Sequence, residues 1–226
     1  MSNKMSLRQN AREPQPNILC ATQMSAIVAA TTPTPPSSTK GLTLRELVHA
    51  IEAEFEHHER LPLNKKDDIK KALASFHADL DELKRYAHFD PSRNYTRNLI
   101  ATDNQTYALM LLCWNKGKYS PIHDHPSDGC WVRHIQGTVH EVRYWNNGTS
   151  LEQTSETFVS EGVTYMDDSL GLHKIGNPSD TTDAITLHLY APPYDKCRLW
   201  LNPADATKSS TAMSTFYSEF GEINQL

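Results

Sequence analysis

The sequence lacks the features that would point to a nucleic-acid-binding, membrane or disulfide-rich protein. Its 22 lysines and arginines are outnumbered by 27 acidic residues, and the net charge of −5 argues against nucleic acid as a partner. No apolar run approaches the roughly 18–20 residues that span a bilayer, so we expect no membrane segment. No CxxC pair occurs among the four cysteines, and nothing like a secretory signal opens the chain. We therefore expect free thiols in a reduced, cytoplasmic compartment.

The composition that remains is that of a globular protein with an N-terminal extension. Hydrophobic residues make up 38% of the 226 residues and charged residues 22%. Residues 1–40 are rich in Ser, Thr, Pro, Gln and Asn, and the run TTPTPPSSTK can neither pack nor form a helix. We predict a disordered or weakly ordered extension over 1–40 and a single domain over 41–226. The basic residues among the first 14 weakly resemble a mitochondrial transit peptide, and we favour the disordered tail.

Helical patterns occupy the first part of the predicted domain. Thr43 is followed three residues later by Glu46, which together form a capping box. Apolar residues then recur at helical spacing, at Leu44, Leu47, Val48, Ile51 and Phe55. We predict a first helix that ends near Arg60, a second after Asn64 and a short third over Leu80–Tyr86.

From Asp90 onward the pattern changes to short strands separated by turns. The predicted strands are Asn94–Ile100, Tyr107–Trp114, Cys130–Gln136, Thr138–Trp145, Leu151–Phe158, Gly162–Met166, His173–Ile175 and Ala184–Tyr190. Many short strands at this spacing are typical of a β-barrel or sandwich. We therefore predict a mainly β fold with two or three N-terminal helices.

Two histidines stand at the centre of the stretch Gly117–Gly137. His123 and His125 are two residues apart, so on an extended strand their side chains point to one face and can share a metal ion. With Cys130, the stretch reads G-x5-H-x-H-x4-C-x6-G. This pattern resembles the first motif of cupin barrels, in which a glutamate ligand stands at the position of Cys130.

A second motif follows in the expected order. Gly162, His173 and Asn177 keep the spacing of the second cupin motif, although Asp168 replaces its proline and Leu170 a glycine. Two motifs in the correct order predict a cupin-type β-barrel, or jelly-roll, in which His173 is the third metal ligand.

The three predicted ligands suggest the kind of metal chemistry. Three neutral imidazoles can bind a divalent first-row metal, whereas common non-haem iron oxygenases use two histidines and one carboxylate. Without that carboxylate the site should favour an anionic ligand from the substrate, and a thiolate is a natural candidate. Zinc is the main alternative, because three-histidine sites also serve hydrolytic zinc enzymes.

The chain resembles thiol dioxygenases of the cysteine dioxygenase type I family from about Leu42 to the C-terminus. The resemblance is densest over Tyr95–Leu99, Cys113–Trp114, Ile122–His125, Gln136–Gly137, Asp168–His173, Leu187–Tyr190 and Pro192–Cys197. It implies iron(II) held by His123, His125 and His173, with L-cysteine and O2 as substrates. The implied product is cysteine sulfinic acid. The implied reaction is the first step of cysteine catabolism towards taurine or towards sulfate and pyruvate. We expect a monomer.

The resemblance also assigns roles around the metal. It implies that Arg97 binds the substrate carboxylate through its planar fork, assisted by Tyr95. On the last predicted strand it implies a supporting set, in which His188 hydrogen-bonds the hydroxyl of Tyr190 and Thr186 replaces the family's serine. It implies a thioether crosslink between Cys130 and Tyr190. It further predicts a cis bond before Pro192, where Ala191 replaces a serine.

Two alternatives remain open at this point. One is a dioxygenase for another thiol, such as 3-mercaptopropionate, and the presence of both Cys130 and Arg97 favours cysteine over it. The other is a cupin that binds a metal or small ligand without turnover. The presence of every expected polar side chain argues against this second alternative.

Overall fold

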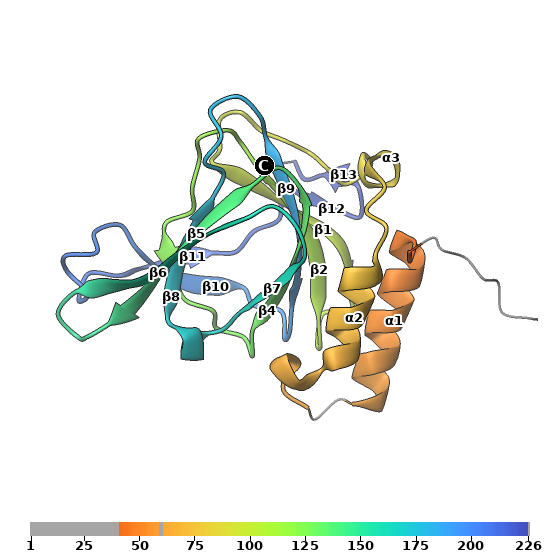
Figure 1. Ribbon diagram of the computed structural model, residues 1–226, viewed down its shortest axis with the longest axis horizontal. Coiled ribbons are helices and arrows are strands. Elements are labelled where there is room, and N and C mark those ends of the chain that lie inside the picture. The colour runs from red at the N-terminus through yellow and green to blue at the C-terminus, as the bar shows by residue number, and fades with distance from the viewer. Residues whose placement is uncertain (1–40, 59–60, 226) are drawn as a thin grey trace, which may run out of the picture. The chain divides into compact units, whose positions relative to one another are not determined.

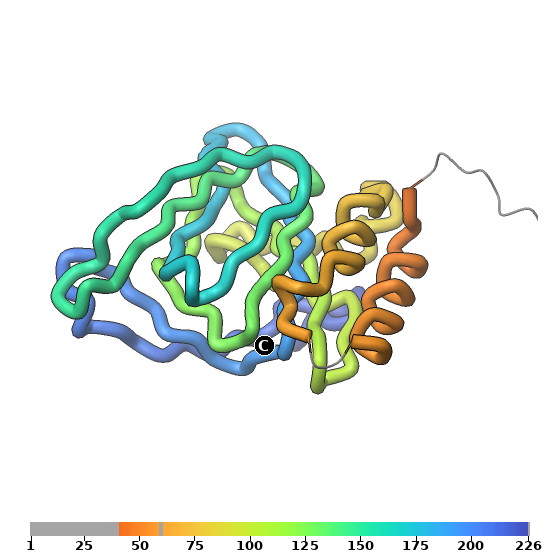
Figure 2. Tube along the Cα trace, turned by 60° about the horizontal axis from the view of Figure 1, so that its bottom comes forward, coloured from red at the N-terminus to blue at the C-terminus, as the bar shows by residue number. Residues whose placement is uncertain are grey.

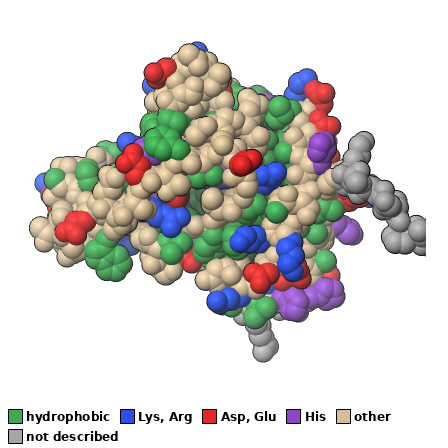
Figure 3. Space-filling view, in the orientation of Figure 1, with side chains coloured by type: hydrophobic (Ala, Val, Ile, Leu, Met, Phe, Trp, Pro, Cys, Tyr) green, Lys and Arg blue, Asp and Glu red, His purple; other side chains and the backbone are tan. Residues whose placement is uncertain are grey.

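The computed structural model describes residues 41–58 and 61–225 (Figure 1). The predicted extension over 1–40 and Cys20 lie outside the described residues. Among the described residues, no helix is long and apolar enough to cross a membrane. On the face shown in Figure 3, basic and acidic side chains are intermixed, without a continuous patch of one sign.

The predicted capping box opens the first helix, α1 (Leu44–His57). The hydroxyl of Thr43 accepts the backbone N–H of Glu46 at 3.3 Å, and the Glu46 carboxylate accepts the backbone N–H of Thr43 at 2.8 Å. These bonds satisfy N–H groups that have no partner within the helix. The capping box is therefore confirmed.

Two shorter helices follow. A 3-10 turn, η1 (Leu63–Lys65), precedes α2 (Asp67–Ser75), so the second helix begins later than a start directly after Asn64. The third helix, α3 (Leu80–Leu83), ends three residues before the predicted Tyr86, because the chain turns there.

The described residues form thirteen strands in two sheets. The first sheet runs in the order β13 (Glu222–Ile223), β12 (Ser218–Glu219), β1 (Tyr95–Thr102), β2 (Ala108–Trp114), β9 (Ala184–Tyr190), β4 (Cys130–Gln136) and β7 (Val163–Met166). The second runs in the order β11 (Ser210–Met213), β10 (Lys196–Trp200), β3 (Ile122–His123), β8 (Leu172–Gly176), β5 (Val139–Asn146) and β6 (Leu151–Val159). Side chains of both sheets meet in a shared interior, which gives the predicted jelly-roll.

All eight predicted strands are present, with ends within two residues of the prediction. The strands that the sequence pattern missed are β3 and the four strands after Tyr190. These are between two and five residues long, and several of them expose most of their side chains. Such short segments are extended because they pair with longer neighbours, and they carry no alternation of their own that could be recognised.

The central strand β9 divides the core into two parts. Ile185, Leu187 and Leu189 belong to the cluster that the helices cover, and in both views the helices lie on one side of the strands (Figures 1 and 2). Because strand residues alternate between faces, the side chains of His188 and Tyr190 lie on the opposite, inner face. The prediction that the leucines of this strand pack on one face, and His188 and Tyr190 lie on the other, is therefore confirmed.

Removing the cap of α1 should destabilise the protein. We expect Thr43→Ala to lower the free energy of unfolding by about 1 kcal/mol, measured by urea unfolding followed by circular dichroism. Arg45→Ala is the matched control, since Arg45 is exposed and makes no side-chain hydrogen bond among the described residues. An equal loss in both variants would contradict the assignment.

Candidate metal centre

The structure brings together the three predicted metal ligands. His123 on β3 lies opposite His173 in the antiparallel pairing of β3 with β8. His125 follows the end of β3, and one ligand atom from each histidine lies within 4.8 Å of the others. The expectation that both early histidines share a strand holds only for His123. His125 is placed by a loop, in which its backbone N–H donates to the carboxylate of Asp168 at 2.6 Å.

The geometry of the imidazoles fits a shared metal ion. The Nε2 atoms of His123 and His173 are 3.1 Å apart. Two nitrogens at right angles, each about 2.1 Å from one first-row metal, would lie about 3.0 Å from each other. The Nδ1 atom of His123 faces the carbonyl oxygen of Pro121 at 3.0 Å, and Nδ1 of His173 faces Glu141 at 2.7 Å. The outer nitrogens of His123 and His173 are thus occupied, and their inner nitrogens remain for a metal, whereas Nδ1 of His125 is buried without a hydrogen-bond partner among the described residues.

Burial prepares these imidazoles as ligands. Removal from water lowers the pKa of His123 well below its usual range, and the neighbouring histidines lower it further. Burial lowers the pKa of His173 in the same way. Both rings are therefore neutral at physiological pH, which is the form that binds a metal ion.

Sequence reasoning missed two carboxylates that support these ligands. Glu141 on β5 also pairs with Arg143 at 3.0 Å, so that its position behind His173 is fixed. Asp124, which is 5% exposed, accepts the backbone N–H of Arg198 at 2.7 Å and its Nε at 2.6 Å. This contact ties the chain between His123 and His125 to β10. The position of Asp124 between His123 and His125 in the sequence could have indicated its role. The role of Glu141 could not have been recognised in this way, because it depends on the register between strands.

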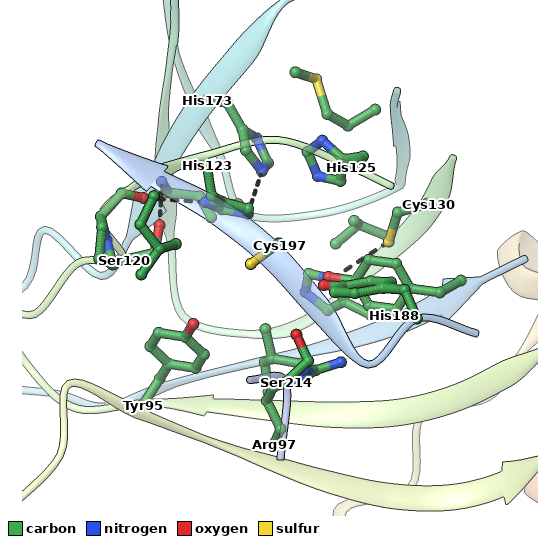
Figure 4. A pocket seen from close by; sticks show the side chains of 18 of the residues that line it. Tyr95, Arg97, Ser120, His123, His125, Cys130, His173, His188, Cys197 and Ser214 are labelled. Atoms are coloured by element: carbon green, nitrogen blue, oxygen red, sulfur yellow. Dashed lines mark hydrogen bonds between the residues drawn. The ribbon is translucent and has the colours of Figure 1, made fainter. Parts of the chain in front are cut away.

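The three imidazoles line one side of a pocket, and Tyr95 and Arg97 lie on the opposite side (Figure 4). Arg97 has no carboxylate within ion-pair distance among the described residues. Its guanidinium contacts the sulfur of Met110 at 3.5 Å and lies 5.3 Å from the ring centre of Tyr194. Tyr194 was not predicted as a site residue. Burial raises its pKa to about 12, so its hydroxyl is protonated.

The predicted supporting residues form a chain of contacts along β9. The Thr186 hydroxyl lies 2.8 Å from Nε2 of His188, and Nδ1 of His188 lies 3.4 Å from the Tyr190 hydroxyl. Trp114, which was not predicted as a site residue, donates its indole N–H to Thr186 at 2.8 Å. All these groups are buried, so each polar atom needs such a partner.

Cys130 lies next to His188 and Tyr190, at the Tyr190 end of this chain of contacts. Its Cα is paired directly with that of Tyr190 across β4 and β9, and its sulfur is 3.5 Å from Nδ1 of His188. Burial raises the pKa of the Cys130 thiol, which is therefore neutral at physiological pH. The bond between Ala191 and Pro192 is cis, as the resemblance predicted.

A jelly-roll with three convergent imidazoles and two cupin motifs defines a cupin-type protein with a candidate metal site. The family model "Cysteine dioxygenase type I" matches residues 34–202, which include every predicted site residue. Cysteine dioxygenase type 1 from Homo sapiens is 37% identical over 159 residues, which cover 69% of this chain and 78% of that protein. The Bos taurus protein of the same name is 35% identical over 186 residues, covering 80% and 90%.

The chain therefore belongs to the cysteine dioxygenase type I family. The predicted family and the prediction of an enzyme are confirmed.

Removing the carboxylate behind His173 should weaken metal binding. We expect Glu141→Ala to lower the affinity for a divalent metal ion, with added iron(II) as the probe, by about 10- to 100-fold, because His173 loses the partner that orients its ring. Affinity is measured by competition with a chromophoric chelator. Glu161→Ala removes an exposed carboxylate that forms no ion pair among the described residues, and it should leave the affinity unchanged. Equal affinity of both variants would remove Glu141 from the site.

Proposed function

We propose that this protein is an iron(II)-dependent cysteine dioxygenase that converts L-cysteine and O2 into cysteine sulfinic acid. The reaction would begin cysteine catabolism towards taurine or towards sulfate and pyruvate. The observation that carries the proposal is Arg97, a guanidinium without a carboxylate partner among the described residues, placed across the pocket from three convergent imidazoles. A thiol that also bears a carboxylate fits both sides of this pocket.

Arg97 would bind and orient the substrate. Its planar fork can donate two parallel hydrogen bonds to a carboxylate, which fixes the direction in which the thiol points. No carboxylate of the described residues near the pocket forms an ion pair with Arg97. Glu141 contacts His173, Asp124 accepts from Arg198, and Asp168 accepts from the backbone of His125. The substrate therefore supplies the anionic groups.

The three histidines would hold iron(II), which when bound supplies the activation of O2 that the amino acids of the chain cannot provide. The reaction balances without another reactant. The thiolate sulfur gains both oxygen atoms and loses four electrons, and O2 accepts those four electrons. The side chains that line the pocket are largely buried, and Cys130, either as a neutral thiol or as a thioether, adds no anion that would compete with the substrate thiolate.

Tyr190 would stand beside the reacting sulfur as a hydrogen-bond donor. Burial raises its pKa well above the usual range, so its hydroxyl keeps its proton. His188 holds that hydroxyl through Nδ1 and is itself held by Thr186 through Nε2. This arrangement fixes a proton near the substrate without placing a charge there.

We propose that Cys130 and Tyr190 form a thioether. Their direct pairing across β4 and β9 supports it. The sulfur would bond to a ring carbon next to the Tyr190 hydroxyl. The S–H and C–H hydrogens would be lost, and O2 would accept the two electrons and two protons. We further propose a cytoplasmic monomer; the cysteines among the described residues form no disulfide with one another, in keeping with a reduced compartment.

Oxygen uptake by the iron-loaded protein tests the activity. We expect uptake and sulfinate formation to be fastest with L-cysteine when homocysteine, cysteamine and 3-mercaptopropionate are compared with it. Absence of uptake with any thiol would contradict the proposed enzyme. Faster uptake with 3-mercaptopropionate would contradict the substrate.

Substitution of Arg97 tests carboxylate binding. We expect Arg97→Ala to raise KM for cysteine by about 10- to 100-fold, because a charged hydrogen-bonded pair is lost. Iron content should not change. Arg97→Lys keeps the charge without the fork and should be intermediate. An unchanged KM in the alanine variant would remove Arg97 from the substrate site.

The crosslink is tested on a denaturing gel. We expect the wild type to run as two bands, for linked and unlinked chains, and Cys130→Ala to run as one. Mass spectrometry should show linked chains lighter by two hydrogens. Cys113→Ala, at another buried thiol, should retain the two bands. Two bands in the Cys130 variant would point to a different cause.

A further inference from the structure

The Arg97 guanidinium is surrounded by aromatic rings. Its central carbon lies 5.8 Å from the ring centre of Tyr190, 5.3 Å from that of Tyr194 and 5.3 Å from that of Phe216. Tyr190 and Tyr194 line the pocket, and their rings meet edge to face at 5.1 Å. Phe216 is not among the residues that line the pocket, and it packs against the core cluster that contains Tyr190.

Phe216 belongs to a segment that is attached to the strand of Arg97. The backbone N–H of Tyr217 donates to the carbonyl oxygen of Arg97 at 2.7 Å. Ser218 on β12 lies opposite Asn98 on β1, and its hydroxyl donates to the Asn98 side chain at 2.8 Å in a fully buried contact. Two successive residues of β1 are thus bonded to the two residues that follow Phe216. This fixes the Phe216 ring against Arg97.

These contacts explain how a largely enclosed cation keeps its orientation without a carboxylate partner. The face of an aromatic ring attracts a guanidinium by about 0.5–2 kcal/mol, and more strongly when water is absent. A carboxylate partner in the protein would neutralise Arg97 and occupy its N–H groups. Aromatic faces do neither, so the guanidinium N–H groups remain able to pair with a ligand. Figure 4 shows Arg97 reaching into the pocket from the side opposite the imidazoles.

We propose that Phe216 is a positioning residue that holds Arg97 in the orientation which recognises the substrate carboxylate. It therefore determines how strongly the site prefers a thiol with a carboxylate over one without. Phe216 touches neither the metal ligands nor the reacting sulfur. The inference rests on the proposed binding of cysteine in this pocket.

The test compares two thiols that differ only in the carboxylate. Iron(II)-loaded protein is titrated by calorimetry without oxygen, with L-cysteine and with cysteamine, and the ratio of the two Kd values is the readout. We expect Phe216→Leu to reduce the preference for cysteine by about fivefold, or about 1 kcal/mol, with cysteamine affinity unchanged. Phe216→Tyr keeps the ring and should keep the wild-type ratio.

Phe220→Leu is the matched control, since Phe220 lies in the same segment and is 50% exposed, whereas the rings near the Arg97 guanidinium are those of Tyr190, Tyr194 and Phe216. In an Arg97→Ala background, Phe216→Leu should have no further effect on the ratio. If Phe216→Leu does not fold, Phe216→Met serves the same purpose.

An unchanged ratio in the Leu variant, or an equal loss of affinity for both thiols, would overturn the inference. Equal affinity of the wild type for both thiols, or binding of neither, would overturn it as well. Absence of oxygen uptake by a wild type that prefers cysteine would contradict the proposed function alone, because the Kd ratio is measured without turnover.

Discussion

The registers of two strand pairs determine whether this protein has a functional site. Pairing of β3 with β8 sets His123 opposite His173, and pairing of β4 with β9 sets Cys130 opposite Tyr190. A shift of either pair by one residue would turn these side chains to the other face of the sheet. The apolar residues that alternate with them, such as Leu187 and Leu189, would then face the polar interior. Burial of the core beneath the helices therefore also fixes the register of β9 against β4.

The charges around the pocket are arranged so that negative groups support the ligands and stay out of the substrate space. Glu141 acts on the outer nitrogen of His173, and Asp124 anchors the loop between His123 and His125 to β10. Inside the pocket, burial lowers the pKa of His123 and His173 and raises that of Tyr190, so these three side chains stay neutral. Among the described residues that line the pocket, Arg97 is the only lysine or arginine. An anion with a carboxylate at one end and a thiolate at the other matches this arrangement, in which Arg97 lies on one side of the pocket and the three imidazoles on the other.

Much of this could be predicted from the sequence, because histidine spacing and strand alternation are local properties. The positions of His123, His125 and His173 follow from two motifs, and the inward face shared by Thr186, His188 and Tyr190 follows from period-two alternation. Phe216 and Glu141 could not be predicted. Each acts on a residue more than 30 positions away in the chain, through a pairing that only the folded sheets define. Tyr194 was missed because its ring turns towards Arg97 after a proline pair, where no alternation applies.

The hydrogen bond between Tyr217 and the Arg97 carbonyl has a consequence for the order in which the site is completed during protein synthesis. All three histidines have been synthesised by residue 173, and the chain grows from its N-terminus at about 5–20 residues per second. A chain interrupted by a premature stop codon after the end of β10 at Trp200, and before residue 210, would contain all three histidines and the strands β1 to β10. It would lack the strand β12 that flanks Arg97. Such a fragment could take up a metal ion while its arginine lacked the neighbours that orient it, so metal content alone is a poor measure of intact protein.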